Sequence, residues 1–274
     1  MSQTKPVYAS FRSIGAYVPE KILSNEDLEK MVDTTDEWIV KRTGIKERRI
    51  AAEDEYTSDM AAKACELAIE RSSVPKEEID LVICATVTPD YFNMPSTACL
   101  ISDKIGIRDV QAFDISAACS GFVYLLTIAK AFIESGMKKN VLIIGAEKMS
   151  AITDYTDRTT CVLFGDAGGA VLMEPNTEGY GIIDTKNYTD GSGRIYLYQT
   201  AGGSVKPPTH ETIDAREHYI HQEGQQVFKF AVKGMADVSV EMMERNNLTS
   251  DELTIIIAKK YIINMVGYVG AWVS

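Results

Sequence analysis

The sequence of 274 residues has little of what marks several special classes of protein. No run reaches the roughly 18 uninterrupted apolar residues of a membrane-spanning helix, and the N-terminus lacks the apolar core of a secretory signal. Basic residues are in deficit: 28 Lys and Arg stand against 39 Asp and Glu, which gives a net charge of −11. We therefore expect a cytoplasmic protein that binds no membrane and no nucleic acid.

Cysteine is sparse, and no two cysteines stand in a C-x-x-C pair. The odd number of thiols and the missing signal predict reduced cysteines, not a disulfide framework or a zinc site, so no metal is expected. The cysteines are Cys65, Cys84, Cys99, Cys119 and Cys161.

The remaining composition, with 45% hydrophobic and 24% charged residues, is typical of a globular protein. The length allows one large domain or two of about 100–150 residues. Strand and helix patterns alternate along the chain, which favours an α/β fold with helix-covered sheets. Strands are expected at 7–19, 79–86, 111–115 and 140–147, and helices at 24–32, 34–44, 57–72, 95–106 and 119–135. Residues 161–174 are expected to form two strands around a glycine turn.

An internal echo links two distant segments. Residues 70–85 resemble residues 244–259 at an offset of 174, and each segment shows a helix end, a polar link and an apolar strand. This echo predicts two halves built on one plan, although chance could also produce so few identities. Residues 188–222 are expected to form a loop-rich insertion.

One cysteine stands where a strand pattern stops and a helix pattern begins. Cys119 lies between Ala117-Ala118 and Ser120-Gly121. At a helix start, free backbone N–H groups and the positive end of the dipole favour a thiolate, and small neighbours leave room for a substrate. A small core residue is the alternative interpretation, and it is the favoured one for the other four cysteines.

Several long motifs share the order and spacing of one family. They are "FDISAACSGFVYLL" (113–126), "DTTDEWIVKRTGIKERR" (33–49), "TDRTTCVLFGDAGGAVL" (156–172) and "GQQVFKFAVKGM" (224–235). Together they resemble the β-ketoacyl-acyl carrier protein synthase III family. The resemblance implies a thiolase fold, with two similar halves in a layered α-β-α-β-α sandwich whose second half is truncated here. The expected halves are residues 1–175 and 176–274.

The resemblance also implies the chemistry. A short acyl-coenzyme A would load its acyl group on Cys119, and malonyl-acyl carrier protein would then lose carbon dioxide and attack the thioester. No cofactor is implied, because acyl-coenzyme A is a substrate. The implied partner proteins are malonyl-acyl carrier protein and a second copy of the chain in a homodimer.

The implied site residues are carried over position by position. Cys119 matches the nucleophile, and Trp38 and Arg42, at i and i+4 of a helix pattern, match the adenine and phosphate end of coenzyme A. Thr34 and Arg158 match further coenzyme contacts, Gly224 and Phe228 match the rim of the pantetheine tunnel, and Met94 matches the end of the acyl pocket. Without the resemblance, Trp38 would be interpreted as a packed side chain and Arg42 as a solvated one.

The sequence departs from the family in its last part. The family's catalytic His, in a Pro-His-Gln-Ala-Asn segment, and its catalytic Asn, in a Gly-Asn-Thr-Ser segment, have no counterpart in the 274 residues. His210, His218 and His221 precede Gly224 in no matching motif and are interpreted as loop residues.

The departure leaves two main hypotheses: a condensing enzyme, or a protein that only binds acyl-coenzyme A or loads the acyl group. A nucleotide-binding enzyme is a third. "FGDAGGA" (164–170) has neither the dinucleotide nor the Walker pattern and is interpreted as a packed strand turn.

Overall fold

The computed structural model of the chain describes residues 5–254. The chain divides into two compact units: Met1–Ile22, Arg49–Ala151 and Gly165–Asn187 form unit 1, and Leu23–Arg48, Ile152–Phe164 and Tyr188–Ser274 form unit 2. No helix among residues 5–254 is long and apolar enough to cross a membrane.

Helices and strands alternate through most of the described chain, as the pattern predicts. The helices are α1 (Asn25–Glu29), α2 (Asp36–Thr43), α3 (Thr57–Ser72), α4 (Thr97–Lys104), α5 (Gly121–Glu134), α6 (His210–Asp214) and α7 (Gly224–Arg245). The strands are β1 (Tyr8–Tyr17), β2 (Lys21–Ser24), β3 (Glu47–Ile50), β4 (Leu81–Ala85), β5 (Gln111–Ile115), β6 (Val141–Lys148), β7 (Asp166–Asn176), β8 (Leu197–Gln199) and β9 (Ile220–Gln222). The α/β expectation is confirmed.

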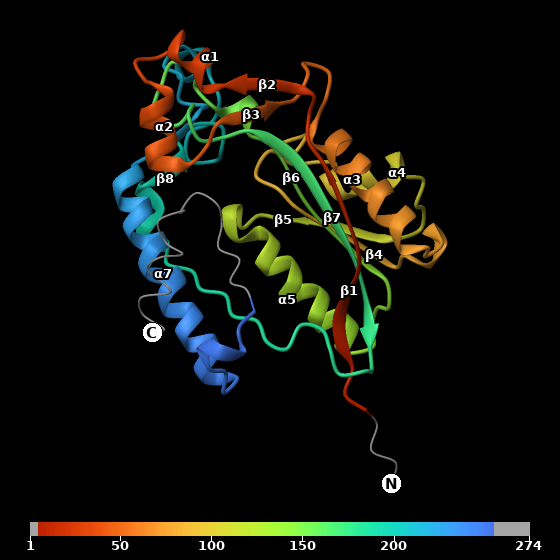
Figure 1. The fold of residues 1–274 in the computed structure, drawn as a ribbon. Coiled ribbons are helices and arrows are strands. Elements are labelled where there is room, and N and C mark those ends of the chain that lie inside the picture. The colour runs from red at the N-terminus through yellow and green to blue at the C-terminus, as the bar shows by residue number, and fades with distance from the viewer. Residues whose placement is uncertain (1–4, 255–274) are drawn as a thin grey trace. The chain divides into compact units, whose positions relative to one another are not determined.

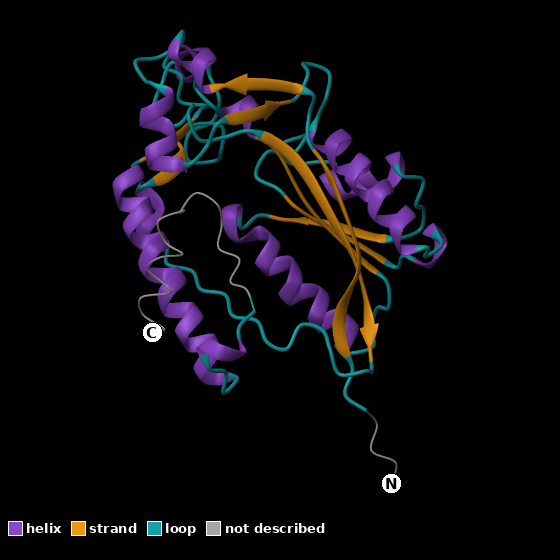
Figure 2. Ribbon diagram, viewed as in Figure 1, coloured by secondary structure: helices purple, strands orange, loops and turns teal. Residues whose placement is uncertain are grey.

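Unit 1 is built on a five-stranded sheet in the order β1-β7-β6-β4-β5. Strands β4, β5 and β6 run parallel, whereas β7 is antiparallel to both of its neighbours. All five residues of β4 are buried, as expected for a central strand covered on both faces. Figure 2 shows the strands in orange and the flanking helices in purple.

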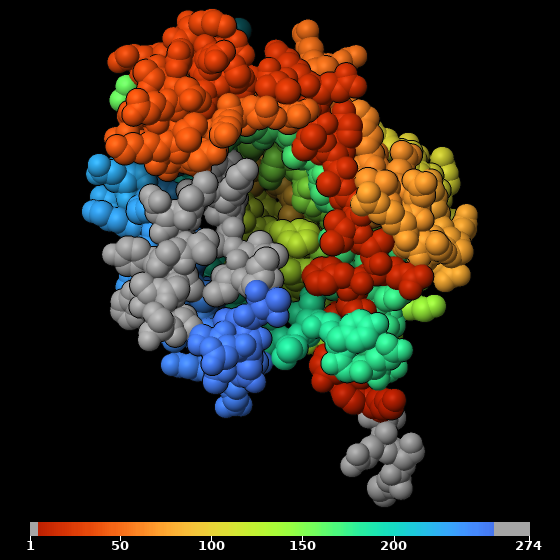
Figure 3. Space-filling model, viewed as in Figure 1, coloured from red at the N-terminus to blue at the C-terminus, as the bar shows by residue number. Residues whose placement is uncertain are grey.

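Helices cover both faces of this sheet (Figure 1). On one face, α3 and α4 pack against the strands in a cluster that includes Cys65, Ile101 and Leu142. On the other face, α5 contributes Leu125, Ala129 and Ile133 to a second cluster. The space-filling view shows residues of β1 at the surface beside those of α3 (Figure 3). The carboxyl ends of the parallel strands therefore lie at one edge of a sheet whose two faces are covered by helices.

Residues 161–174 differ from the expectation of two strands around a glycine turn. Residues 161–163 form a turn, and one continuous strand, β7, begins at Asp166 and contains Gly168 and Gly169. The reason is close packing against α3: a Cβ on Gly168 would lie 2.6 Å from the carbonyl oxygen of Met60. Gly168 thus permits helix and strand to approach.

Unit 2 holds the short helices α1 and α2. A capping box between Ser24 and Asp27 opens α1. Helix α2 begins after Thr35 and ends at Gly44, whose φ of 68° is left-handed. Leu28 and Ile39 anchor the two helices in a small apolar cluster with Cys161 and Val162. The expected insertion at 188–222 is indeed mostly loop, with α6 and the pair β8–β9 inside it.

Candidate active site

Cys119 lies in unit 1, between the end of β5 and the start of α5. It is exposed and belongs to a short 3-10 helix, Ala118–Ser120, so α5 begins at Gly121 rather than at Cys119 as expected. The thiol is therefore presented just before the first helical turn, at the carboxyl edge of the parallel strands.

The turn that carries Cys119 is tight and strained. Ala118 has a φ of +42°, a left-handed conformation that costs energy for a residue with a side chain. The amides of Ser120 and Gly121 donate to the carbonyls of Ala117 and Ala118. Since those amides are occupied within the turn, the N–H of Cys119 itself is the candidate donor to a substrate oxygen.

The other cysteines divide by burial. Cys65, Cys84 and Cys161 are buried, and burial raises the pKa of all three, to about 11 for Cys161. The expectation of a core position is wrong for Cys99, which is exposed. Helix α4 turns Ala98 and Ile101 inward, so Cys99 falls on its outer face.

A second group of predicted site residues gathers in unit 2. The guanidinium carbon of Arg42 lies 4.4 Å from the ring centroid of Trp38, which confirms that these two residues share one face of α2. The guanidinium carbon of Arg158 lies 5.1 Å from the same ring. Trp38 is also packed against the apolar cluster of unit 2. The structure thus assembles an indole and two cations from segments far apart in the sequence.

Asp33 holds Arg158 at this indole. Nη1 of Arg158 donates to the Asp33 carbonyl at 2.6 Å and lies 3.6 Å from its carboxylate. Next to it, the hydroxyl of Thr34 is buried and finds no hydrogen-bond partner within the described part of the chain. Sequence reasoning missed Asp33, although it opens the quoted motif. Such a cluster suits a ligand with an aromatic ring and anionic groups.

The remaining predicted residues are placed separately. Met94 lies in unit 1, in the segment between β4 and α4, with 78% of its surface exposed. Gly224 is the first residue of α7 and Phe228 follows one turn later, with 46% of its surface exposed. His210 begins α6 and His221 lies in β9, so these two are not loop residues as expected, whereas His218 precedes β9.

Two carboxylates in apolar strands escaped the sequence analysis. Asp114 of β5 accepts the amides of Thr97 and Ala98 at 2.6 and 2.7 Å and so caps α4. Glu147 of β6 binds the segment that follows β4. The signal that could have found them is an acidic residue within an apolar run. Within residues 5–254, no three His, Cys, Asp or Glu side chains form a potential metal site.

Comparisons with known proteins agree on one family. The family model described as 3-oxoacyl-[acyl-carrier-protein (ACP)] synthase III matches residues 113–191. The β-ketoacyl-[acyl-carrier-protein] synthase III of Sulfurovum sp. (strain NBC37-1) is 66% identical over 254 residues, which cover 92% of this chain and 75% of the relative. The protein of the same name from Sulfurimonas denitrificans is 59% identical, over 90% of this chain and 74% of the relative.

Solved structures show the same likeness. The 3-oxoacyl-[acyl-carrier-protein] synthase III of Aquifex aeolicus VF5 matches with a TM-score of 0.87 at 41% identity, over 97% of this chain and 80% of that one. The β-ketoacyl-[acyl-carrier-protein] synthase III of Thermus thermophilus also gives 0.87, at 38% identity, over 97% of this chain and 81% of that one.

Proposed function

Because this chain belongs to the 3-oxoacyl-[acyl-carrier-protein] synthase III family, we propose that two groups of its residues serve the family's reaction. One is a nucleophile in unit 1, and the other is a coenzyme site in unit 2. The chain is a condensing acyltransferase with the thiolase fold, of the type that initiates fatty acid synthesis. The proposed primer is a short acyl-coenzyme A, and the proposed extender is malonyl-acyl carrier protein.

The observation that carries the proposal is the exposed Cys119 at a strained turn before α5. Its thiolate attacks the acyl carbonyl of acyl-coenzyme A, a bond forms between the carbonyl carbon and Sγ, and the coenzyme leaves as a thiol. The backbone N–H of Cys119 stabilises the oxyanion. In the family's second half reaction, malonyl-acyl carrier protein loses carbon dioxide, its carbanion attacks the thioester, and the cysteine leaves as a thiol.

The proposed coenzyme site is the group around Trp38. The indole face receives the adenine ring, while Arg42 and Arg158 bind phosphate groups. Three contacts support this assignment: both guanidinium groups lie over the indole, and Asp33 restrains Arg158. The hydroxyl of Thr34, which has no hydrogen-bond partner among residues 5–254, supplies a further donor.

Three residues are proposed to contact the acyl-pantetheine chain. Gly224 and Phe228, one turn apart on α7, form the rim of the tunnel, and Met94 closes the acyl pocket. A methionine side chain adapts its shape more easily than an aromatic ring, so Met94 is the proposed determinant of the acyl length that the site accepts.

The proposed assembly is a homodimer. Strand β5 is an outer strand of the sheet in unit 1, so one of its edges is available for pairing. The loop before α4 exposes Tyr91, Phe92 and Met94, each with more than half of its surface accessible. We further propose a cytoplasmic enzyme that needs no cofactor, and a division into halves at residues 175 and 176.

Acyl transfer to the protein tests the proposal. The chain is incubated with acetyl-coenzyme A and digested, and the peptides are mapped by mass spectrometry. The acetyl group is expected on the peptide that contains Cys119, and the matched variant Cys119→Ser should carry none. A protein that binds coenzyme A but remains unacylated would favour one form of the alternative, a thiolase-fold protein that only binds acyl-coenzyme A. Acylation of Cys119 without β-ketoacyl product would favour its other form, a protein that only loads the acyl group.

A further inference from the structure

A partly buried carboxylate lies near the end of β6. Glu147 is the seventh residue of this strand, and the six residues before it carry no charge. Burial raises the pKa of Glu147, so the folded protein keeps a costly group at this position. Hydrogen bonds offset that cost, and they come from one short segment.

The donors are Thr86, Val87 and Thr88, the residues that follow β4. The amide of Val87 donates to Oε1 at 2.9 Å and the amide of Thr88 donates to Oε2 at 3.0 Å. The hydroxyls of Thr86 and Thr88 also donate to Oε2. Since β4 ends at Ala85, the carboxylate of Glu147, rather than the backbone of a neighbouring strand, accepts the amides of Val87 and Thr88.

This bound segment and Ala85, the last residue of β4 just before it, together touch both sides of the turn that carries Cys119. Before the turn, the amide of Thr86 donates at 3.3 Å to the carbonyl of Ile115, the last residue of β5. After the turn, α5 begins at Gly121, where a Cβ would lie only 2.9 Å from the Cβ of Ala85. The start of α5 therefore rests directly on the end of β4.

The turn itself needs outside support. Ala118 holds a left-handed φ of +42°, and such a conformation persists only where the surroundings enforce it. The contacts point to Glu147 as that support. We propose that Glu147 is a positioning residue, whose carboxylate fixes Thr86–Thr88 and thereby fixes both ends of the Cys119 turn. This inference rests on the proposed role of Cys119 as nucleophile.

The test compares two thiols in one molecule. Glu147→Gln keeps the size of the side chain but replaces one acceptor oxygen by an NH₂ group that faces other donors. The chain and its variant are treated with limiting iodoacetamide, and the ratio of labelling at Cys119 to labelling at Cys99 is measured by peptide mapping. We expect the ratio to fall about fivefold in the variant, as for the loss of one or two neutral hydrogen bonds.

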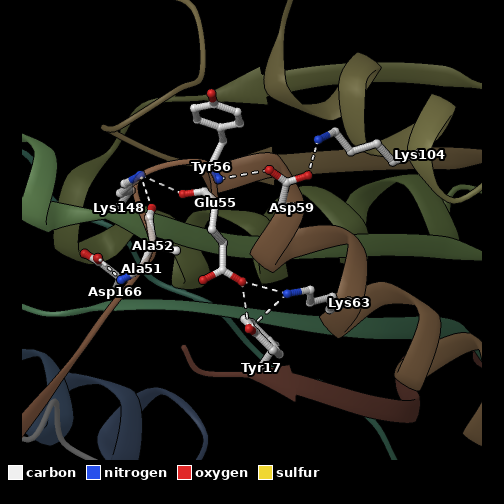
Figure 4. Close-up of polar contacts among 10 residues, drawn as sticks. All are labelled: Tyr17, Ala51, Ala52, Glu55, Tyr56, Asp59, Lys63, Lys104, Lys148 and Asp166. Carbon is white, nitrogen blue, oxygen red and sulfur yellow. Dashed lines mark hydrogen bonds and ion pairs between the residues drawn. The ribbon is translucent and has the colours of Figure 1, made fainter. Parts of the chain in front are cut away.

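Two further variants separate positioning from general stability. Asp166→Asn alters a buried carboxylate in the same sheet that accepts the amides of Ala51 and Ser150, each at 2.8 Å. Figure 4 shows its bond to Ala51. This control should leave the ratio unchanged. Glu147→Asp keeps the charge and should recover part of the lost ratio.

The outcomes decide the proposal. An unchanged or higher ratio in Glu147→Gln overturns it. If that variant unfolds, which labelling of the buried Cys65 and Cys84 would reveal, Thr88→Val decides instead, because it keeps the shape and removes the hydroxyl that donates to Glu147 and accepts the amide of Lys148. A fall of about twofold then supports the proposal, and an unchanged ratio overturns it. If Cys119 reacts no faster than Cys99 before any mutation, the proposed nucleophile fails together with this inference.

Discussion

At the scale of single residues, the five cysteines differ in burial and therefore in how readily their thiols can react. Cys99 and Cys119 are exposed, whereas burial raises the pKa of Cys65 and Cys84. We predict that limiting iodoacetamide labels Cys119 first, because it lies at a strained turn directly before a helix N-terminus, whereas Cys99 lies inside the first turn of α4 and its amide already donates to the hydroxyl of Ser96. Peptide mapping over time measures this order. Faster labelling of Cys99 would show that exposure alone, not the turn, governs reactivity.

Arg42 is the residue on which coenzyme binding should depend most visibly. We predict that Arg42→Ala weakens the binding of coenzyme A by about 1–3 kcal/mol, because a charged hydrogen bond to phosphate and a contact with the Trp38 ring are lost together. Calorimetric titration measures the dissociation constant. Arg108→Ala, which alters an arginine with 79% of its side chain exposed, is the matched control. An unchanged constant in Arg42→Ala would remove Arg42 from the site.

Residues of the candidate site were predictable where their signal is local. The shared face of Trp38 and Arg42 follows from their spacing in one helix, and Cys119 stands at a visible joint between two patterns. Asp33 gave no such signal, because its partner lies 125 residues away in the sequence. Glu147 stands out as an acidic residue in an apolar run, but its partners lie about 60 residues away and could not be identified. A single sequence does not show which distant segment a carboxylate will bind.

At the scale of elements, two adjacent glycines in β7 have different surroundings. A Cβ on Gly168 would lie 2.6 Å from a backbone oxygen of α3, whereas a Cβ on Gly169 would meet its nearest atom at 3.9 Å. We predict that Gly168→Ala lowers the free energy of unfolding by about 2–3 kcal/mol, because strand and helix must separate. Urea denaturation measures the loss. Gly169→Ala is the control, and an equal loss in both variants would refute the packing argument.

A surface ion pair ties the Arg158 segment to the loop region of unit 2. Nε and Nη2 of Arg216 donate to the two carboxylate oxygens of Asp154, and these bonds hold the pKa of Asp154 below its usual value of 3.8. A lowered carboxyl pKa stabilises the folded state above pH 3.8, and this contribution is lost as the pH falls below that value. The pair should therefore matter at neutral pH and not in acid.

The corresponding experiment is thermal unfolding of Arg216→Gln at several pH values. We predict that the variant has a lower Tm than the unchanged chain at pH 7, and that this gap narrows as the pH falls below 3.8. Lys233→Gln, which breaks the exposed pair with Asp237, should change Tm little at any pH. A gap that stays constant with pH would mean that Arg216 acts by packing alone.

Most elements of unit 1 were predictable because their apolar periodicity matches their final burial. The run of residues 81–85 is buried throughout, as a central strand should be. The expectation failed at 161–174, where the glycines suggested a turn. Gly168 instead allows α3 to pack closely against β7, and that requirement comes from a helix about 100 residues earlier in the chain. Glycine alone does not distinguish a turn from a close approach.

At the scale of the whole molecule, the internal echo has structural support in the described residues. After α3 comes a 3-10 helix at Lys76–Glu78, and after α7 comes another at Ser250–Glu252, at the same offset of 174 residues. The strand that the echo expects next falls mostly on residues 255–274, outside the described residues. The division into two halves on one plan stays a prediction.

The two half reactions make different demands on the 274 residues. Acyl loading needs Cys119 and the coenzyme site, and the residues proposed for both are present. Condensation needs donors for the enolate and thioester oxygens, and the family's His and Asn segments are not in the sequence. Losing even one such donor typically costs about 10²–10³ in rate. We therefore predict that a polypeptide of these 274 residues loads an acyl group but forms little or no β-ketoacyl product.

The most direct test follows the label from radiolabelled acetyl-coenzyme A in one reaction that also contains malonyl-acyl carrier protein. We predict that the label appears on the peptide of Cys119 and that almost none appears in β-ketoacyl-acyl carrier protein. A protein with the complete family-like C-terminal half is the positive control for condensation. Label on another residue, or on none, would contradict Cys119 as the acyl acceptor. Near-normal product would show that other residues of this chain replace the missing pair.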